Sequence, residues 1–172
     1  MRDYTKITIF GGTGFIGRHI VDRAADEGWS VHVPSRRPAS AYFLRTAGFV
    51  GQIVAQACNI MSDDDLQGMV AGSTHVVNCI GILAEKSKGD FDRIHHQFPA
   101  RLAKACAKAG VQRLVHISAL GADENAPSRY ARSKARGEAA LLEHFPQATI
   151  MRPSIVFGPG DDFFKMFARI SK

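Results

Sequence analysis

The sequence is poor in cysteine and has no long apolar run, and both shortages restrict the class of protein. Its 172 residues include three cysteines, Cys58, Cys79 and Cys106, with no Cys-x-x-Cys pair. This odd, dispersed set argues against a disulfide framework or a zinc site and predicts reduced thiols in the core. No apolar run approaches the ~18 residues of a membrane span, and the N-terminus MRDYTKITIFGG lacks the apolar stretch of a signal peptide. We expect a cytoplasmic protein, with a peripheral place on a membrane complex as the alternative.

Charge of one sign is also not concentrated anywhere. The 22 Lys and Arg against 16 Asp and Glu give a net charge of +6, but the basic residues are scattered and Arg36-Arg37 is the densest pair. A solvated basic surface is therefore a better interpretation than a nucleic-acid groove. With 45% hydrophobic residues the composition is that of an ordinary globular protein, and the length fits one domain.

Apolar β-branched runs alternate with amphipathic helical patterns along the chain. The expected strands cover residues 5–10, 30–33, 50–55, 74–79, 113–118 and 148–152, and the expected helices cover 15–27, 62–69, 90–109 and 129–144. Strands that alternate with helices form parallel sheets through right-handed crossovers. The pattern predicts an α/β protein with a Rossmann-type doubly wound parallel sheet of strand order 3-2-1-4-5-6, whose strands end along one ligand-binding edge.

A glycine-rich turn, GGTGFIG at residues 11–17, follows the first strand and opens the first helix. Glycine allows the tight turn and lets backbone N–H groups approach a pyrophosphate, which the positive end of the helix also attracts. The alternative is a glycine-rich turn without a ligand, and the strand–turn–helix context disfavours it. The candidate dinucleotide-binding residues here are Gly11, Thr13, Gly14, Phe15, Ile16 and Gly17.

Three arginines suggest which dinucleotide is bound. The second strand is followed by Pro34-Ser35-Arg36-Arg37, without the carboxylate that accepts the ribose 2′-OH of NAD. Arginine matches the geometry and charge of a phosphate, and Arg18 lies just past the glycine turn. We therefore expect NADP(H), with NAD(H) as second choice; the alternative is that Arg36 and Arg37 are plain surface charges.

A tyrosine and a lysine four residues apart form the candidate catalytic pair. Tyr130 and Lys134 share one face of a helix, so the lysine is expected to lower the tyrosine pKa and to hold a nicotinamide ribose. Tyr130 would then act as a general acid or base, with the hydroxyl of Ser118 polarising a carbonyl. The alternative is that Tyr130 packs at a helix start and Lys134 is solvated.

The remaining polar clusters predict no metal site. His95 and His96 are adjacent on a helix and diverge by about 100°, so we interpret them as ordinary polar positions. His116 lies inside a strand and is expected to be packed. The acidic run 63–65 follows Ser62 as the first turn of a helix, where negative charge is favourable.

The order of these motifs resembles the short-chain dehydrogenase/reductase superfamily, in its extended or atypical, NAD-dependent epimerase/dehydratase-like branch. The matching segments are GGTGFIG at 11–17, NCIG at 78–81, HISALGA at 116–122, YARSK at 130–134 and RPSIVFGPGD at 152–161. The resemblance implies that Asn59 and Ile60 lie near the adenine. It also implies that Cys79, Ile80 and Gly81 pass under the adenine ribose, and that the segment from Pro153 through Ile155 to Val156 lines the nicotinamide pocket.

A narrower resemblance covers Phe98-Pro99 through AGVQRLVHISALGA and the stretch from SRYARSK to FFKMFARI. These segments are similar to the short-chain-dehydrogenase-like accessory subunit of respiratory complex I and its bacterial relatives, which implies a tightly bound nucleotide and a respiratory-complex partner. The sequence departs from the enzymatic pattern at His95, where the superfamily has an asparagine that helps to hold a proton-relay water.

These observations predict a dinucleotide-binding domain over residues 1–158 and the start of a truncated C-terminal lobe over 159–172. In that second part Phe163, Phe164, Met166, Phe167 and Ile170 have helical spacing and need a partner surface. The leading hypothesis is a cofactor-holding accessory protein. The second is an active reductase, dehydrogenase or epimerase that uses Tyr130, Lys134 and Ser118, and a nucleic-acid-binding protein ranks third.

Overall fold

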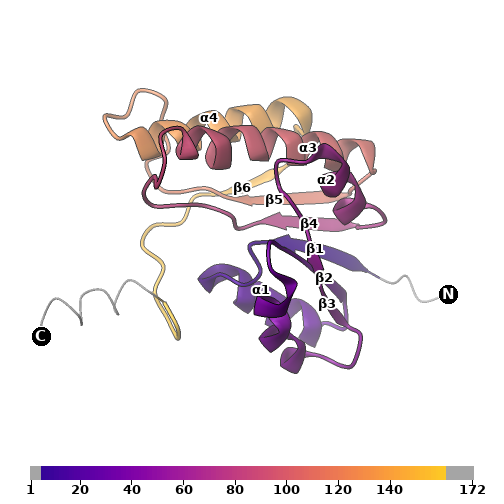
Figure 1. Ribbon diagram of the computed structural model, residues 1–172. Helices are drawn as coiled ribbons and strands as arrows, with labels where there is room; N and C mark the ends of the chain where they lie inside the picture. The colour runs from indigo at the N-terminus through magenta and orange to yellow at the C-terminus, as the bar shows by residue number, and fades with distance from the viewer. Residues whose placement is uncertain (1–4, 162–172) are drawn as a thin grey trace, which may run out of the picture.

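The strands of the computed structural model, which describes residues 5–161, form one parallel sheet with helices on both faces (Figure 1). The sheet consists of β1 (Lys6–Phe10), β2 (Ser30–Ser35), β3 (Ile53–Ala57), β4 (His75–Asn78), β5 (Arg113–Ile117) and β6 (Thr149–Met151). The helices are α1 (Phe15–Asp26), the 3₁₀ helix η1 (Pro38–Ala47), α2 (Asp63–Val70), the π-helical turn η2 (Asp92–Gln97), α3 (Phe98–Lys108) and α4 (Arg129–His144). The strand order β3-β2-β1-β4-β5-β6 confirms the predicted doubly wound Rossmann-type sheet.

The strand register brings three residues, two of them polar, into one row near the carboxyl edge of the sheet. Phe10 pairs with Asn78, and Asn78 pairs with His116. All three are buried. Because neighbouring parallel strands end at this edge, the loops that follow β1, β4 and β5 are brought together above the row.

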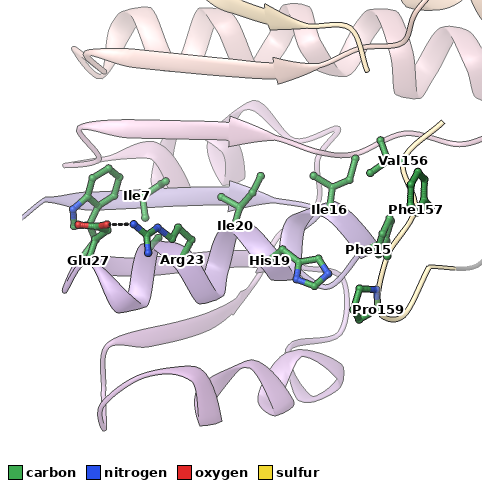
Figure 2. A pocket seen from close by; sticks show the side chains of 13 residues that line it. Ile7, Phe15, Ile16, His19, Ile20, Arg23, Glu27, Val156, Phe157 and Pro159 are labelled. Carbon is green, nitrogen blue, oxygen red and sulfur yellow. Dashed lines mark ion pairs between the residues drawn. The ribbon is translucent and has the colours of Figure 1, made fainter. Parts of the chain in front are cut away.

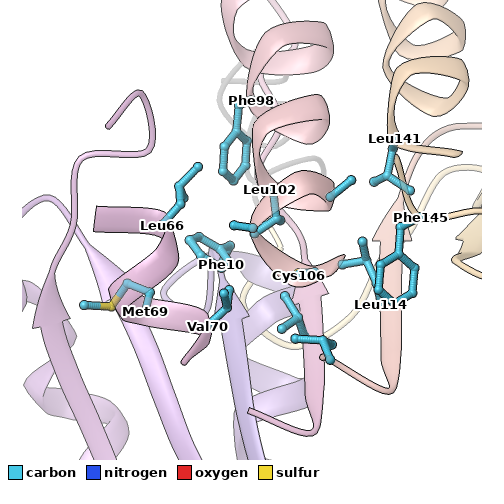
Figure 3. Close-up of a cluster of buried hydrophobic side chains, with 14 of the residues drawn as sticks. Phe10, Leu66, Met69, Val70, Phe98, Leu102, Cys106, Leu114, Leu141 and Phe145 are labelled. Carbon is cyan, nitrogen blue, oxygen red and sulfur yellow. The ribbon is translucent and has the colours of Figure 1, made fainter. Parts of the chain in front are cut away.

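Two hydrophobic clusters hold the layers together. One lies between the sheet and α2, α3 and α4, where Phe10 packs against Phe98 with ring centroids 5.6 Å apart (Figure 3). The other lies between the sheet and α1 and η1 and includes Ile9 and Val33. Of the three cysteines, Cys58 and Cys106 are buried as expected, whereas Cys79 is only half-buried.

The helix expected over residues 90–109 contains a π-helical turn that the sequence analysis did not foresee. The N–H of Phe98 donates to the carbonyl of Arg93, five residues back. Pro99 explains the wider turn, since it has no N–H for the carbonyl of His95 and its ring would collide with that carbonyl in a regular helix.

The ends of other elements differ from the predicted ends, or agree with them, for local reasons. The second strand continues to Ser35 rather than ending before Pro34. The N–H of Val31 donates to the carbonyl of Gln52, on the β3 side. Because backbone N–H groups alternate along a strand, the nitrogen of Pro34 points to the β1 side. Pro34 lies beyond the last residue of β2 that pairs with β1, so the strand loses no hydrogen bond there. Helix α4 has the predicted ends, and Ser62 caps α2 by accepting the N–H of Asp65.

Candidate functional site

The glycine turn and the loop after β4 are in contact at the carboxyl edge. The N–H of Cys79 donates to the carbonyl of Phe10 at 2.8 Å. A Cβ added to Gly11, whose φ is +80°, would approach the carbonyl carbon of Cys79 to 3.0 Å. The two loops can approach this closely because Gly11 has no side chain.

Gly14 and Gly17 have different roles in the turn. A Cβ at Gly17 would overlap the carbonyl oxygen of Gly11, so this glycine is required for the helix to pack on the turn. A Cβ at Gly14 would meet only that same oxygen, at 3.2 Å. Gly14 and Thr13 are exposed, so the space above Gly14 is open to a ligand.

The N-terminal end of α1 suits an anion. Gly14 is the N-cap residue and provides no side-chain cap, and the first turn, which begins with Phe15 and Ile16, has no acidic residue. The first N–H groups of a helix lack internal partners and attract negative charge. The glycine turn therefore fits the pyrophosphate of a dinucleotide.

The three candidate phosphate-binding arginines lie in different environments. Arg36 and Arg37 follow β2 and are exposed, and within residues 5–161 their guanidinium groups form no hydrogen bond or ion pair. Arg18, in contrast, donates to the carbonyl oxygens of Pro159 at 3.2 Å and Gly160 at 2.5 Å. A role for Arg18 in phosphate binding requires release of these two carbonyls.

The residues expected near the adenine form the turn between β3 and α2. The N–H of Asn59 donates to Asp65 at 2.6 Å, and the side-chain oxygen of Asn59 accepts the N–H of Met61 at 3.1 Å. Asn59 is exposed, and Ile60 packs against the core. The turn is thus fixed by its own hydrogen bonds at the edge of the sheet.

Asn78 fixes both the loop after β4 and the tautomer of His116. Its side-chain oxygen accepts the N–H of Ile80 at 2.9 Å, so its amide nitrogen donates to Nδ1 of His116 at 3.0 Å. The proton of His116 is therefore on Nε2, which has no hydrogen-bond partner within the described residues. Burial, with the nearby Lys134 charge, lowers the pKa of His116 to about 3.

Tyr130 and Lys134 lie on successive turns of α4, and each has its own partners. The Tyr130 ring meets the His95 and Phe91 rings edge-on, at 5.4 and 5.9 Å between centroids. Lys134 is buried, and its Nζ donates to the carbonyl of Ile117 at 2.9 Å. The alternative of a solvated Lys134 is therefore wrong.

The pKa directions also differ from expectation. Burial raises the pKa of the Tyr130 hydroxyl, the opposite of the lowering expected from Lys134. Burial lowers the pKa of Lys134 itself to about 8, against the raising effects of Glu138 and Cys79. Among the described residues no hydrogen bond joins Tyr130 to Lys134, so the lysine charge does not compensate the tyrosine for its desolvation.

Ser118 lies immediately after β5 and is buried. Its N–H donates to the carbonyl of Met151 at 2.7 Å, and its hydroxyl has no partner within the described residues. Such an unpaired buried hydroxyl is costly unless a ligand or water meets it. The Ser118 hydroxyl thus has hydrogen-bonding capacity that the described residues do not use.

His95 was given no role of its own in the sequence analysis. It was interpreted as an ordinary polar position that departs from the superfamily's asparagine, but its side chain is 1% exposed and forms hydrogen bonds to both the loop after β4 and helix α4. The helical spacing already contained the signal: His95 lies four residues after Phe91 and three before Phe98, on the apolar face.

The segment after β6 runs back towards α1. The carbonyl of Pro153 accepts the N–H of Leu120 at 2.8 Å, while Ile155 is 65% exposed. Val156 lies over an apolar groove of about 460 Å³ along α1, with Phe15 and Ile16 at the same end (Figure 2). This groove includes neither Gly14 nor the Tyr130–Lys134 pair, but it shares Phe15, Ile16 and Val156 with the candidate binding residues.

The described part of the chain contains neither a metal-binding cluster nor a membrane-spanning helix. Among residues 5–161 there is no group of three or more His, Cys, Asp or Glu side chains arranged to hold a metal ion. No helix in the same range has the length and apolar character to cross a membrane.

The sequence matches the profile of the NAD dependent epimerase/dehydratase family over residues 7–170. It is 36% identical over 162 residues to mouse NADH dehydrogenase [ubiquinone] 1 alpha subcomplex subunit 9, mitochondrial, a match that spans 94% of this chain and 43% of the mouse protein. It is 32% identical over 155 residues to the ceramide reductase of Caulobacter vibrioides, across 90% of this chain and 47% of that protein. The chain thus spans less than half the length of these two relatives.

Solved structures share the fold. A short-chain dehydrogenase/reductase superfamily protein from Agrobacterium tumefaciens, crystallised with bound NAD, superposes with a TM-score of 0.67 at 23% identity. The match covers 86% of this chain and 48% of the Agrobacterium chain. At this identity the likeness concerns the arrangement of helices and strands.

Proposed function

Because the chain belongs to the NAD dependent epimerase/dehydratase family, we propose that it binds a dinucleotide across the glycine turn and the loop after β4. The observation that carries the proposal is the end of α1, which has no capping side chain and no acidic residue in its first turn. It is in contact with the 79–82 loop through Gly11. A diphosphate above Gly14 would accept the free N–H groups of the first helical turn.

The chain offers residues for every part of the ligand. We assign Asn59 and Ile60 to the adenine, Cys79, Ile80 and Gly81 to the adjacent ribose, Lys134 to the nicotinamide ribose, and Pro153, Ile155 and Val156 to the nicotinamide pocket. Lys134 uses one donor on Ile117, and an ammonium group has three, so two N–H donors are left for ribose hydroxyls. A bound nicotinamide supplies hydride transfer.

Replacing Gly14 tests dinucleotide binding without breaking the turn. The Gly14→Ala methyl group meets only one oxygen, at 3.2 Å, but it occupies the expected position of the pyrophosphate. We expect this variant to melt near the wild-type temperature and to lose most of its affinity for dinucleotide, as measured by isothermal titration calorimetry. Gly68→Ala, where no atom lies within 4 Å of the added Cβ, is the matched control. Equal affinity for the dinucleotide in wild type and Gly14→Ala would refute the proposed pyrophosphate site at Gly14.

We further propose that NADP(H) is preferred over NAD(H). Arg36 and Arg37 are exposed at the end of β2 without ion-pair partners in the described part of the chain, so a ribose 2′-phosphate would displace no internal contact. Arg36→Ala with Arg37→Ala is expected to weaken NADPH binding about tenfold or more and to leave NADH binding nearly unchanged. Equal losses for the two dinucleotides would show that these arginines are plain surface charges.

The best-supported role is that of a cofactor-holding accessory protein. The 36% identity to a subunit named for NADH dehydrogenase supports a respiratory membrane complex as the partner and a peripheral position on it. The raised Tyr130 pKa and His95 at the superfamily's asparagine position favour binding over rapid proton transfer. Mass spectrometry of the denatured, purified protein should detect one dinucleotide per chain, and that dinucleotide should not exchange or turn over with added carbonyl compounds.

An active reductase, dehydrogenase or epimerase is the second candidate. It is supported by the buried Lys134, by the unpaired hydroxyl of Ser118 and by the identity to a ceramide reductase. In this role Tyr130 donates or accepts the proton and Ser118 polarises the carbonyl. Carbonyl-dependent oxidation of bound cofactor that disappears in Tyr130→Phe would favour the enzyme over the accessory role.

A further inference from the structure

His95 lies where three segments meet, and the sequence of its helix explains why. The π-helical turn ahead of Pro99 brings the backbone of His95 onto α4, where a Cβ at Gly137 would overlap the His95 carbonyl oxygen. The side chain is fully enclosed, with its ring stacked on Phe91 at 5.3 Å. The imidazole therefore has one position between α4 and the loop after β4.

The hydrogen bonds of His95 define one tautomer. Nε2 accepts the N–H of Ile82 at 3.0 Å, so the ring proton is on Nδ1 and is donated to the Ser133 hydroxyl at 2.8 Å. Ser133 in turn donates to the carbonyl of Tyr130 at 2.7 Å. The chain of donors runs in one direction from the loop after β4 to the first turn of α4.

The same loop passes directly over the candidate binding groups. A Cβ at Gly81 would lie 3.7 Å from both Nε2 of His95 and Nζ of Lys134. Ile80 is tied to Asn78, and Ile82 is tied to His95. The loop is therefore held on both sides of Gly81, and the second tie is a side chain from a distant helix.

We propose that His95 is a positioning residue, whose neutral imidazole holds the 79–82 loop in register with Lys134 and the Tyr130 turn of α4. The consequence for binding rests on the proposed dinucleotide function, in which this loop and Lys134 contact the two riboses of the ligand. The bond to Ile82 sets the loop, and the enclosure of the ring and its stack on Phe91 keep the imidazole in place.

Two substitutions separate the two bonds. The side-chain amide of His95→Gln reaches the position of Nε2 and accepts from Ile82. The shorter amide of His95→Asn reaches only the position of Nδ1 and contacts Ser133. Ser133→Ala is the matched control, because it removes the second bond and leaves the first. The readouts are the dissociation constant for NADPH and the hydrogen-exchange rate of the Ile82 amide in the ligand-free protein.

We expect His95→Gln and Ser133→Ala to bind NADPH within about twofold of wild type, and His95→Asn to bind about tenfold more weakly, the size of one lost hydrogen bond. The Ile82 amide should exchange at least about tenfold faster in His95→Asn alone. Should the Asn variant fail to fold, His95→Phe, which keeps the ring but neither bond, replaces it with the same expectation.

Equal Ile82 exchange in wild type and His95→Asn, or equal losses of affinity in all the variants, would overturn the positioning role. A wild-type protein that binds no dinucleotide would overturn the proposed function only. The exchange of Ile82 would still decide whether His95 holds the loop.

Discussion

Buried histidines share the carboxyl edge of the sheet with a buried lysine, and each remains neutral for an identifiable reason. His95 and His116 are both 1% exposed, and each accepts an N–H group at one ring nitrogen. Burial and the Lys134 charge lower the pKa of His95 to about 4 and that of His116 to about 3. Protonation of either ring would place a second positive charge beside Lys134 and break a hydrogen bond.

Stability should therefore fall as the pH drops below 6.5, the usual histidine pKa. Between pH 6.5 and about 4 the unfolded chain binds protons that the folded protein refuses, so the free energy of unfolding decreases by up to about 1.4 kcal/mol per pH unit for each such histidine. His116→Asn keeps an acceptor for Asn78 and removes one titrating ring. Urea titrations at pH 6.5, 5.5 and 4.5 should give a shallower acid slope for this variant; parallel slopes would contradict the assignment. His19→Asn, at an exposed histidine, is the control.

Residue-level predictability depended on how many signals agreed at a position. The glycines of the first turn were predictable because the turn follows a strand and opens a helix. The importance of His95 was not predicted, since its polar side chain concealed its place on the apolar face. The burial of Lys134 was not predicted either, because α4 carries it under a loop whose path no local pattern specifies.

At the scale of the elements, α4 and η2 pack so closely that their backbones touch. Gly137 has no side chain at the point where the carbonyl of His95 touches α4. Pro99 frees that carbonyl from the helix ladder, and the π-helical turn moves it outward. One proline and one glycine, 38 positions apart in sequence, thus allow two helices to meet backbone to backbone.

Gly137→Ala should destabilise the protein by about 1–3 kcal/mol, because the added methyl group overlaps a backbone oxygen that cannot move without shifting η2. Gly68→Ala, in α2 with open space around the added Cβ, should instead be neutral or stabilising by up to about 1 kcal/mol. Chemical denaturation of both variants measures the difference. Similar stabilities for the two variants would mean that η2 can shift away from α4 at little cost in free energy.

The predictability of each element followed the number of local signals that agreed. Helix α4 was predicted to the residue because Pro146, which cannot continue a helix, follows its last turn. The 3₁₀ helix η1 was not predicted. Only two of its residues, Ala41 and Leu44, are buried, which is too few to form a recognisable apolar face in the sequence. The expected apolar helical face from Phe163 to Ile170 lies outside the described residues.

At the scale of the whole molecule, the six strands differ in how well they are enclosed. β1 and β4 each pair with two neighbours, whereas β6 pairs only with β5 and comprises three residues. The order of the strands was predictable because parallel connections have one hand. The packing of residues 152–161 was not, because their apolar residues Ile155, Val156 and Phe157 are consecutive and have no periodicity that fixes a partner.

Amide hydrogen exchange should follow this arrangement. Ile9 and Val77, in the two central strands, should exchange most slowly, at rates close to those set by global unfolding, and Met151 in β6, whose backbone faces β5, should exchange faster by an order of magnitude or more. Nuclear magnetic resonance exchange measurements on the ligand-free protein check the order. Equal protection of all three amides would show that the sheet opens only as one unit.

Arg18 donates hydrogen bonds to the carbonyl oxygens of Pro159 and Gly160. These bonds link the N-terminal end of α1 to the segment that follows β6. An incoming anion that recruits this guanidinium must compete with those two oxygens. By reciprocity, anion binding at the first helix weakens the hydrogen bonds of Arg18 to these two carbonyls, and those hydrogen bonds weaken anion binding by the same factor.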